Sequence, residues 1–319
     1  MQLTELRPSS FKEFIGQENL KKTLKAMIDS AKQQKKILSH LLFYGLPGMG
    51  KTTLVSLIGS EMNKKIHFIQ GTNIERKSDL INVLSVINEG DIVFIDEIHS
   101  INKTVVEFLY NAMEDFVFDL IIGVEGNSRP MRMKIKPFTL IGATTKINEI
   151  SQPLKDRFGY IGRLINYNDV EIFKILKNTA KRLNIDINDE CIEKIVSYSR
   201  KTPRIANHLL QRVNDFAISL NEGKINLKTI KKTFKCMDLY EYGLSKDHIE
   251  YLEILKEAFF EKYASLFTLT GLARFAKEDI LTEIEPILLF YELIEKTSRG
   301  RRISSKGLDY LIRQNLFSK

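Results

Sequence analysis

The sequence predicts an α/β fold: a parallel sheet built around a phosphate-binding loop, followed by a small helical domain and a winged-helix domain. Strand-like apolar runs at 37–45, 91–97 and 138–145 alternate with helical patterns, which is typical of a buried parallel sheet. A glycine-rich motif separates the first of these runs from a helix. After about residue 165 the pattern becomes helical, with a basic turn near the end.

The bulk properties are those of a globular protein. With 319 residues, the chain is longer than one core usually serves. No apolar run reaches the roughly 18 residues that span a bilayer, and the N-terminal residues do not resemble a signal peptide. The only cysteines, Cys191 and Cys236, stand in unrelated contexts, which argues against a disulfide or metal site and favours the cytoplasm. The net charge of +8 permits nucleic-acid contact, although an AT-rich genome explains a Lys-rich composition equally well.

The elements follow in order. A helix is expected at 18–36, where Leu20, Leu24, Met27 and Ile28 share one face, and another at 52–62. Between the second and third strands, 117–136 predicts a hairpin around a Gly-Asn turn. Further helices are expected at 169–183, 188–200, 203–220, 226–236, 248–263, 268–276 and 278–295, with a linker at 242–248. The expected domains are therefore 1–165, 166–240 and 241–319, the last carrying the basic turn at 296–307 as a wing.

The segment GLPGMGKTT (45–53) matches the phosphate-loop pattern through Gly45, Gly50, Lys51 and Thr52. Glycines let backbone amides curl around phosphates, and the start of the next helix adds a favourable dipole. In such a loop the lysine bridges the β- and γ-phosphates and the Thr52 hydroxyl binds Mg²⁺. ATP and Mg²⁺ are the cofactors that this pattern predicts.

Two carboxylates end the strand at 91–97. Asp96 is the candidate Mg²⁺ ligand beside Thr52, and Glu97 is the candidate that orients the attacking water. Acidic residues also end strands simply as turn formers, but the spacing from the phosphate loop favours the catalytic interpretation. Thr145 ends the strand at 138–145, and Arg157 and Arg204 carry the planar fork that suits phosphate oxygens. Taken singly, each of these three is more often structural.

These elements together resemble the AAA+ ATPases, and within them the RuvB family of bacterial Holliday-junction motors. The resembling stretches include LRPSSFKEFIGQ (6–17), NAMEDFVFDLIIG (111–123), PLKDRFG (153–159), TPRIANHLLQRV (202–213) and IEPILLF with RGR (284–301). They occur in the family's order over nearly the whole chain. The phosphate loop alone indicates only a P-loop NTPase, whereas the combination of MEDF, hairpin, GATT and TPRIAN is far more specific.

The resemblance implies the remaining site residues. Arg157 would be an arginine finger that enters the neighbouring subunit's site, and Arg204 would be a sensor of the γ-phosphate. The other residues implied to surround ATP are Leu6, Arg7, Ile15, Gly48, Thr53, Glu114, Asp115, Phe116 and Tyr167. The family implies a homo-hexameric ring on duplex DNA that drives four-way junctions, with a RuvA-type partner and a junction resolvase as a candidate further component.

Two surfaces are implied to bind these partners. Lys296, Arg299 and Arg301 in the basic turn would contact DNA phosphates, which suits a motor that moves along any sequence. Leu120, Ile121, Ile122 and Val124 in the hairpin would dock the RuvA-type protein, although an apolar hairpin face more often covers its own domain. Lys296 stands where the family usually has arginine, and the hairpin tip VEGNSRP departs from the family's small residues.

Two other functions compete with the motor. An ATP-switched clamp loader or initiator would remodel a DNA-bound complex without translocation, but neither a collar domain nor zinc-binding cysteines are evident. A DNA-binding scaffold with a vestigial ATP site is disfavoured by the intact Lys51, Asp96, Glu97 and Arg157.

Overall fold

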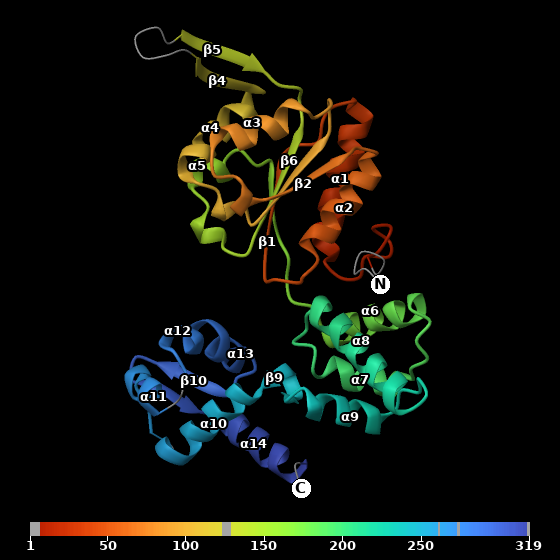
Figure 1. Ribbon diagram of the computed structural model, residues 1–319, viewed down its shortest axis with the longest axis vertical. Helices are drawn as coiled ribbons and strands as arrows, with labels where there is room; N and C mark the ends of the chain where they lie inside the picture. The colour runs from red at the N-terminus through yellow and green to blue at the C-terminus, as the bar shows by residue number, and fades with distance from the viewer. Residues whose placement is uncertain (1–6, 123–128, 261, 273–274, 318–319) are drawn as a thin grey trace. The chain divides into compact units, whose positions relative to one another are not determined.

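The computed structural model describes residues 7–122, 129–260, 262–272 and 275–317 of the chain. The chain forms two compact units (Figure 1). The first runs to Ile175 and includes Thr202–Arg204, and the second comprises Leu176–Lys201 and the chain from Ile205 onward. The expected domain boundaries at 165 and 240 stay predictions.

A parallel sheet lies at the centre of the first unit, as the sequence predicts. Its strands are ordered β2 (Ile66–Gln70), β3 (Ile92–Asp96), β6 (Thr139–Thr144), β1 (Leu41–Tyr44) and β7 (Tyr160–Arg163), and every neighbouring pair is parallel. All six residues of β6 are buried, including Thr139 and Thr144 at its ends, as expected of a strand covered on both faces. Because the strands are parallel, β1, β3 and β6 deliver their carboxyl ends to one edge.

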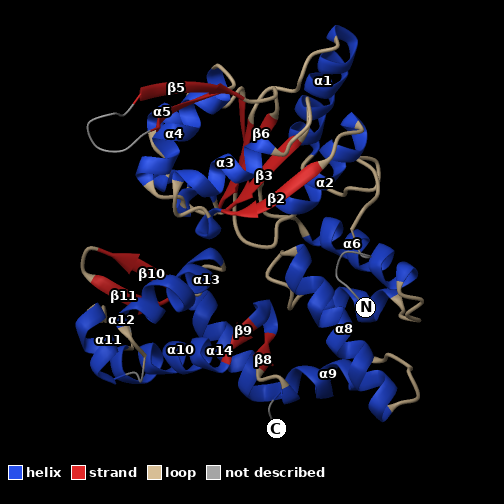
Figure 2. Cartoon of the chain, turned by 45° about the horizontal axis from the view of Figure 1, so that its top comes forward, coloured by secondary structure: helices blue, strands red, loops and turns tan. Residues whose placement is uncertain are grey.

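Helices cover both faces of this sheet (Figures 1 and 2). On one face lie α1 (Glu18–Gln34) and α2 (Lys51–Met62), close to the predicted bounds, and α1 buries the predicted Leu20, Leu24 and Ile28. On the other lie α3 (Lys77–Ser85) and α4 (Lys103–Glu114), which the sequence pattern did not predict. A cap fixes the start of α4, where the Asn102 side chain accepts a hydrogen bond from the amide of Thr104.

The predicted hairpin is formed by β4 (Val117–Ile122) and β5 (Arg129–Lys134), an antiparallel pair that projects from the unit (Figure 1). Its base belongs to the core: the Phe118 ring stacks on Phe108 of α4 at a centroid distance of 4.5 Å, and Ile135 is buried. Farther along, Met131 is 48% exposed. The apolar face is thus continuous from the core into solvent. The predicted Gly-Asn turn lies outside the described residues.

The helices that begin the second half of the chain are α6 (Asp169–Arg182), α7 (Asp189–Val196), α8 (Pro203–Leu220) and α9 (Leu227–Cys236), within a few residues of the predicted bounds. Asn188 and Asn226 cap α7 and α9 with their side chains. The predicted linker is wrong in character. Residues 242–248 contain β9 (Leu244–Ser245), which pairs antiparallel with β8 (Leu239–Tyr240) just before the segment, and the first residues of the next helix. Arg200 holds the segment in place by donating from Nε to the carbonyl of Gly243 at 2.8 Å.

The C-terminal part is a winged helix, as predicted. Its helices are α10 (Lys246–Phe259), α11 (Leu266–Leu272), α12 (Lys277–Asp279) and α13 (Glu285–Phe290), and its wing pairs β10 (Ile294–Thr297) with β11 (Gly300–Ile303). The predicted helix at 278–295 is wrong at its end and contains a π-helical stretch at 280–284. It stops because Glu292 takes a φ of 59° and Leu293 bonds back to Leu288. A final helix, α14 (Ser305–Phe317), was not predicted.

Candidate functional site

The phosphate loop joins β1 to α2 at the carboxyl edge of the sheet. Gly45, Gly48 and Gly50 have φ values of 152°, 78° and 99°, which L side chains rarely adopt. At Gly48 a β-carbon would lie 2.8 Å from the Arg204 β-carbon, so glycine is needed there for space as well. The loop therefore forms an anion cradle at the start of α2, with Arg204 beside it.

Lys51 begins α2 and turns back over this cradle. Its Nζ donates to the carbonyl oxygens of Gly45 (2.8 Å) and Leu46 (3.1 Å). Burial lowers the pKa of Lys51, while the nearby carboxylates of Glu97 and Asp96 oppose that shift. The predicted lysine and both predicted carboxylates are therefore brought together. Thr52 and Thr53 follow on the first turn, half-buried.

Glu97 is held in a defined position after β3. Its φ of 48° lies in the left-handed region, and its Oε2 accepts from the amide and the hydroxyl of Thr145, each at 3.1 Å. His99 Nδ1 lies 3.2 Å from the same oxygen and 3.0 Å from Thr144 Oγ1. The structure thus joins the predicted Glu97 and Thr145. Sequence reasoning missed His99, although a histidine two residues after paired carboxylates was a visible signal.

These residues fit a nucleotide and a magnesium ion. The positive-φ glycines open the cradle to phosphate oxygens. The first turn of α2 carries the Thr52 hydroxyl, and Asp96 ends β3 at the same edge of the sheet, with β6 between β3 and β1. Hydroxyl and carboxylate oxygens are ligands that Mg²⁺ prefers.

A second group of residues frames the loop from the N-terminal side. Tyr167 is buried and its hydroxyl donates to the carbonyl of Met49 at 3.2 Å, and burial raises the pKa of Tyr167. The Gln17 side chain exchanges two hydrogen bonds with the backbone of Ile165, at 2.7 and 3.0 Å. Ile15 and Arg7 are half-buried in the same segment, and the predicted Leu6 lies outside the described residues.

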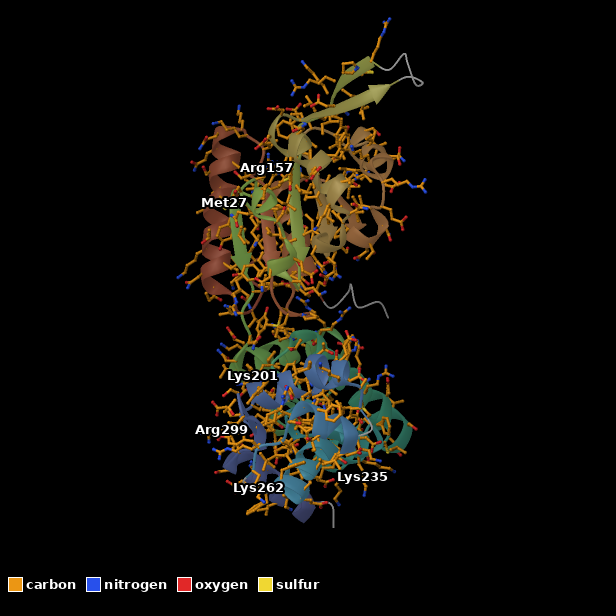
Figure 3. The ribbon with its side chains drawn as sticks, turned by 90° about the vertical axis from the view of Figure 1, so that its left-hand side faces the viewer. Met27, Arg157, Lys201, Lys235, Lys262 and Arg299 are labelled. Atoms are coloured by element: carbon orange, nitrogen blue, oxygen red, sulfur yellow. The ribbon has the colours of Figure 1, made fainter. Side chains whose placement is uncertain are left out.

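Arg157 lies away from the phosphate loop, in the turn after α5 (Gln152–Lys155) (Figure 3). Its guanidinium stacks 4.2 Å from the centre of the Tyr110 ring, pairs with Glu114 at 3.2 Å and donates to the carbonyl of Pro153 at 2.7 Å. Its Nε is buried without a hydrogen-bond partner in the described structure. An unsatisfied buried donor costs about 1–3 kcal/mol, so the hydrogen bonding of Arg157 is incomplete in this conformation.

The MEDF segment connects the hairpin to this arginine. Asp115, next to Glu114, pairs with Arg132 of β5 at 3.1 Å, and Arg132 also lies 3.4 Å from Asp119 of β4. Phe116 packs edge-on against Phe138 with ring centroids 5.9 Å apart. Among the described residues, no interaction joins Glu114 or Asp115 to Lys51, Asp96 or Glu97.

In the hairpin, Leu120 is half-buried and packs toward the core that α4 covers. Ile121 and Ile122 continue β4 opposite Pro130 and Arg129. Val124 lies outside the described residues.

In the wing, Lys296 and Arg301 are direct cross-strand partners. Both donate to the carboxylate of Glu285 on α13, at 2.7 and 2.6 Å. Arg299 is exposed in the turn between the strands (Figure 3). The sequence pattern gave no sign of Glu285.

No helix within the described ranges has both the length and the apolar character needed to cross a membrane.

Family models match almost the whole chain in three consecutive parts. They are the Holliday junction DNA helicase RuvB P-loop domain (residues 6–164), the RuvB AAA lid domain (167–239) and the RuvB C-terminal winged helix domain (241–312).

Similar proteins span the full length. The chain is 63% identical over 316 residues to the Holliday junction branch migration complex subunit RuvB of Mycoplasmopsis synoviae, with 99% of each chain covered. It is 48% identical to the protein of that name in Mycoplasmopsis pulmonis, covering 97% of this chain and 98% of the other. A solved structure, the Thermotoga maritima RuvB Holliday junction branch migration motor, matches with a TM-score of 0.80 at 36% identity, covering 97% and 98% of the two chains. The chain therefore belongs to the RuvB family of ATP-driven Holliday junction branch-migration motors.

Proposed function

We propose that this chain forms a homo-hexameric ring on duplex DNA and uses ATP to pull the arms of four-way junctions, with a RuvA-type protein as its partner. The observation that carries the proposal is the separation of the hydrolytic groups. Lys51, Asp96 and Glu97 share one edge of the sheet, whereas Arg157 lies against Tyr110, away from them. In the proposed ring, the Arg157 of a neighbouring copy completes each site, which makes hydrolysis depend on assembly.

Within one subunit, the residues around the loop take separate roles. Lys51 exchanges its two loop carbonyls for phosphate oxygens when ATP binds, and Arg204 reads the γ-phosphate from its place beside Gly48. Mg²⁺, held by Thr52 and Asp96, supplies charge neutralisation at the phosphates. The segment with Arg7 and Ile15, together with Tyr167, frames the base, and the undescribed Leu6 stays a predicted member of that group.

Glu97 orients the attacking water in this proposal. In the structure its Oε2 accepts from Thr145 and lies 3.2 Å from His99, whereas no described residue donates to Oε1, which is the oxygen left to accept from water. Thr145 is therefore both the holder of the carboxylate and the residue best placed to register the γ-phosphate.

Arg157 acts on the neighbouring subunit's ATP. Its incomplete hydrogen bonding favours release from Tyr110 and Glu114 when a phosphate is offered. A finger of this kind supplies roughly 10³–10⁵ in rate. Glu114, Asp115 and Phe116 then stand at the subunit boundary, consistent with their predicted place near that ATP.

The two remaining surfaces bind partners. The exposed, apolar end of the hairpin is the proposed dock for the RuvA-type protein, with Leu120, Ile121, Ile122 and the undescribed Val124 as its predicted members. The wing contacts DNA phosphates through Lys296, Arg299 and Arg301. A junction resolvase stays a candidate further component, and the cytoplasm, where bacterial DNA lies, is the proposed place of action.

The test is conversion of a synthetic four-way junction to duplex arms in the presence of ATP and Mg²⁺, with and without a RuvA-type protein. We expect conversion that needs ATP hydrolysis and is faster with the partner. ATPase activity without conversion under any condition would instead identify an ATP-switched loader or initiator.

A further inference from the structure

A buried carboxylate lies directly behind the wing. Glu285, on α13, is only 1% exposed, yet it accepts from three side chains. Arg301 Nε donates to Oε1 at 2.6 Å, Lys296 Nζ to Oε2 at 2.7 Å, and the Tyr251 hydroxyl to Oε1 at 3.0 Å. This is the most completely paired buried charge of the described winged helix, and none of the roles considered above uses it.

The carboxylate is ionised despite its burial. Burial by itself raises the pKa of Glu285, but the hydrogen bonds from Arg301, Lys296 and Tyr251 more than offset that effect, and the pKa lies below its usual value. A buried ion pair is weak evidence for stability, since apolar residues of similar volume often serve a fold as well. Stabilisation of the fold alone therefore does not account for this buried charge, and its contacts point to a further task.

The register of the wing shows what that task is. Lys296 and Arg301 face each other directly across β10 and β11, an arrangement in which like charges repel. Glu285 places one oxygen on each cation and so lets two positive charges share one face. On the other face of the wing the cross-strand partners have opposite charges, and Arg302 pairs with Glu295 at 2.7 Å.

Glu285 also fixes how Arg301 points. The backbone of Arg301 is pinned by two hydrogen bonds to Ala264, at 2.7 and 2.9 Å. One edge of its guanidinium, Nε and Nη2, faces Glu285 at 2.6 and 3.5 Å, and no described residue accepts from Nη1. Lys296 keeps 40% of its side chain exposed and Arg301 keeps 12%. Each cation thus has one side on Glu285 and donors left for a phosphate.

We propose that Glu285 is a positioning residue for DNA: it orients Lys296 and Arg301 together so that both meet the phosphate backbone without first losing side-chain freedom. This inference rests on the proposed DNA contact of the wing. It makes a prediction opposite in sign to simple electrostatics. Removing an anion beside DNA should strengthen binding, whereas removing an orienting anion weakens it.

The experiment compares two carboxylates of the same module in the full-length protein. Glu285→Gln and Glu295→Gln remove the same charge, but the second side chain is exposed and contacts Arg302 instead. We expect Glu285→Gln to weaken binding to a fluorescent duplex by about tenfold, the loss of one charge-assisted hydrogen-bond set. Glu295→Gln should leave affinity equal or slightly tighter. Equal or tighter binding by Glu285→Gln would overturn the proposal.

Salt dependence separates orientation from general damage. If Glu285 aligns two phosphate contacts, its loss lowers the magnitude of the slope of log K against log salt by up to about two, although the protein has become more positive. A merely loosened fold would lower the unfolding temperature and leave that slope unchanged at temperatures well below unfolding, which would also overturn the proposal.

Two further variants keep the test decisive. If Glu285→Gln does not fold, Tyr251→Phe removes one donor from the carboxylate without changing charge, and we expect a smaller weakening of DNA binding. Unchanged affinity overturns the proposal.

Lys296→Gln combined with Arg299→Gln tests the wing itself. Unchanged affinity there removes the wing from DNA binding, whereas a loss there without a loss in Glu285→Gln removes only the positioning role.

Discussion

At the scale of single residues, the side chains proposed to carry out hydrolysis are each held by contacts within their own subunit. Lys51 bonds its own loop, Glu97 bonds Thr145, and Arg157 bonds Glu114 and Pro153. In the proposed function, phosphate oxygens replace the partners of Lys51 and Arg157. ATP hydrolysis would then require several hydrogen bonds to change together, and an isolated subunit should hydrolyse ATP slowly.

His248 gives a prediction for pH. It is 4% exposed at the start of α10, where its Nδ1 accepts from the Ser245 amide at 3.2 Å. Burial, followed by the charge of Arg200, lowers its pKa from 6.5 to about 4. The neutral form is therefore favoured in the folded state, and this stability is complete above pH 6.5 and is lost as pH falls toward 4. The loss amounts to at most about 3 kcal/mol.

Thermal unfolding measured between pH 7.5 and 5 checks this prediction. We expect a falling unfolding temperature in the wild type and a flatter profile in His248→Asn, which cannot take up the proton. Parallel profiles for the two proteins would show that other groups determine the acid sensitivity.

Residues differed in how well the sequence predicted them. Gly45, Gly50, Lys51 and Asp96 were predictable because a motif and a strand end fix their places within a few residues of chain. The partners of Glu97 and Arg157 were not, since Thr145 and Glu114 come from distant segments and only folding brings them close. Glu285 was invisible for the same reason: its donors lie 11, 16 and 34 residues away.

At the scale of elements, the hairpin divides into a base and an exposed end. Phe118 and Ile135 fix the base in the core, whereas Met131, opposite Leu120 in the register, faces solvent. The interpretation that the apolar face covers its own domain is confirmed at the base of the hairpin, whereas docking of a partner on the exposed end stays a prediction. The alternation of residues could not show where along the strand this change occurs.

Met131→Glu tests the exposed end. A carboxylate on that apolar face should abolish stimulation of the ATPase by the RuvA-type protein while basal hydrolysis persists, because burying an unpaired charge at an interface is costly. Lys134→Glu is the matched control, with the same new side chain on the polar face of the same strand. Equal loss in both variants would point to general charge repulsion rather than to an apolar dock.

At the scale of the whole molecule, the sequence correctly predicted the order of the three parts along the chain: the parallel sheet, the group of helices and the winged helix. The helices from α6 to α9 were predictable because each carries a single apolar stripe. The segment around β8 and β9 was not, since its order depends on Arg200 and Tyr310, which lie far away in sequence. Side chains from other elements, rather than local composition, turned an expected linker into structure.

The proposed ring makes a prediction that a single subunit cannot test. Lys51→Ala and Arg157→Ala should each abolish hydrolysis, and Arg157→Ala should still bind ATP. When the two variants are mixed in equal amounts, about one quarter of the sites regain both residues, because each site takes its lysine and its arginine from different subunits. Recovered ATPase activity in the mixture is the expected result. No recovery, with mixed rings shown to form, would place Arg157 in its own subunit's site.

The hydrogen bonds of Lys51 with its own loop have a calorimetric consequence. If Lys51 binds phosphate as proposed, ATP must first displace the carbonyls of Gly45 and Leu46, which lie 2.8 and 3.1 Å from its ammonium group. Binding would then replace hydrogen bonds to two neutral carbonyls with contacts to charged phosphate oxygens, and its net enthalpy should be smaller than that of the phosphate contacts alone. Lys51→Ala should therefore change the enthalpy of ATP binding only slightly while it strongly lowers the rate of ATP hydrolysis.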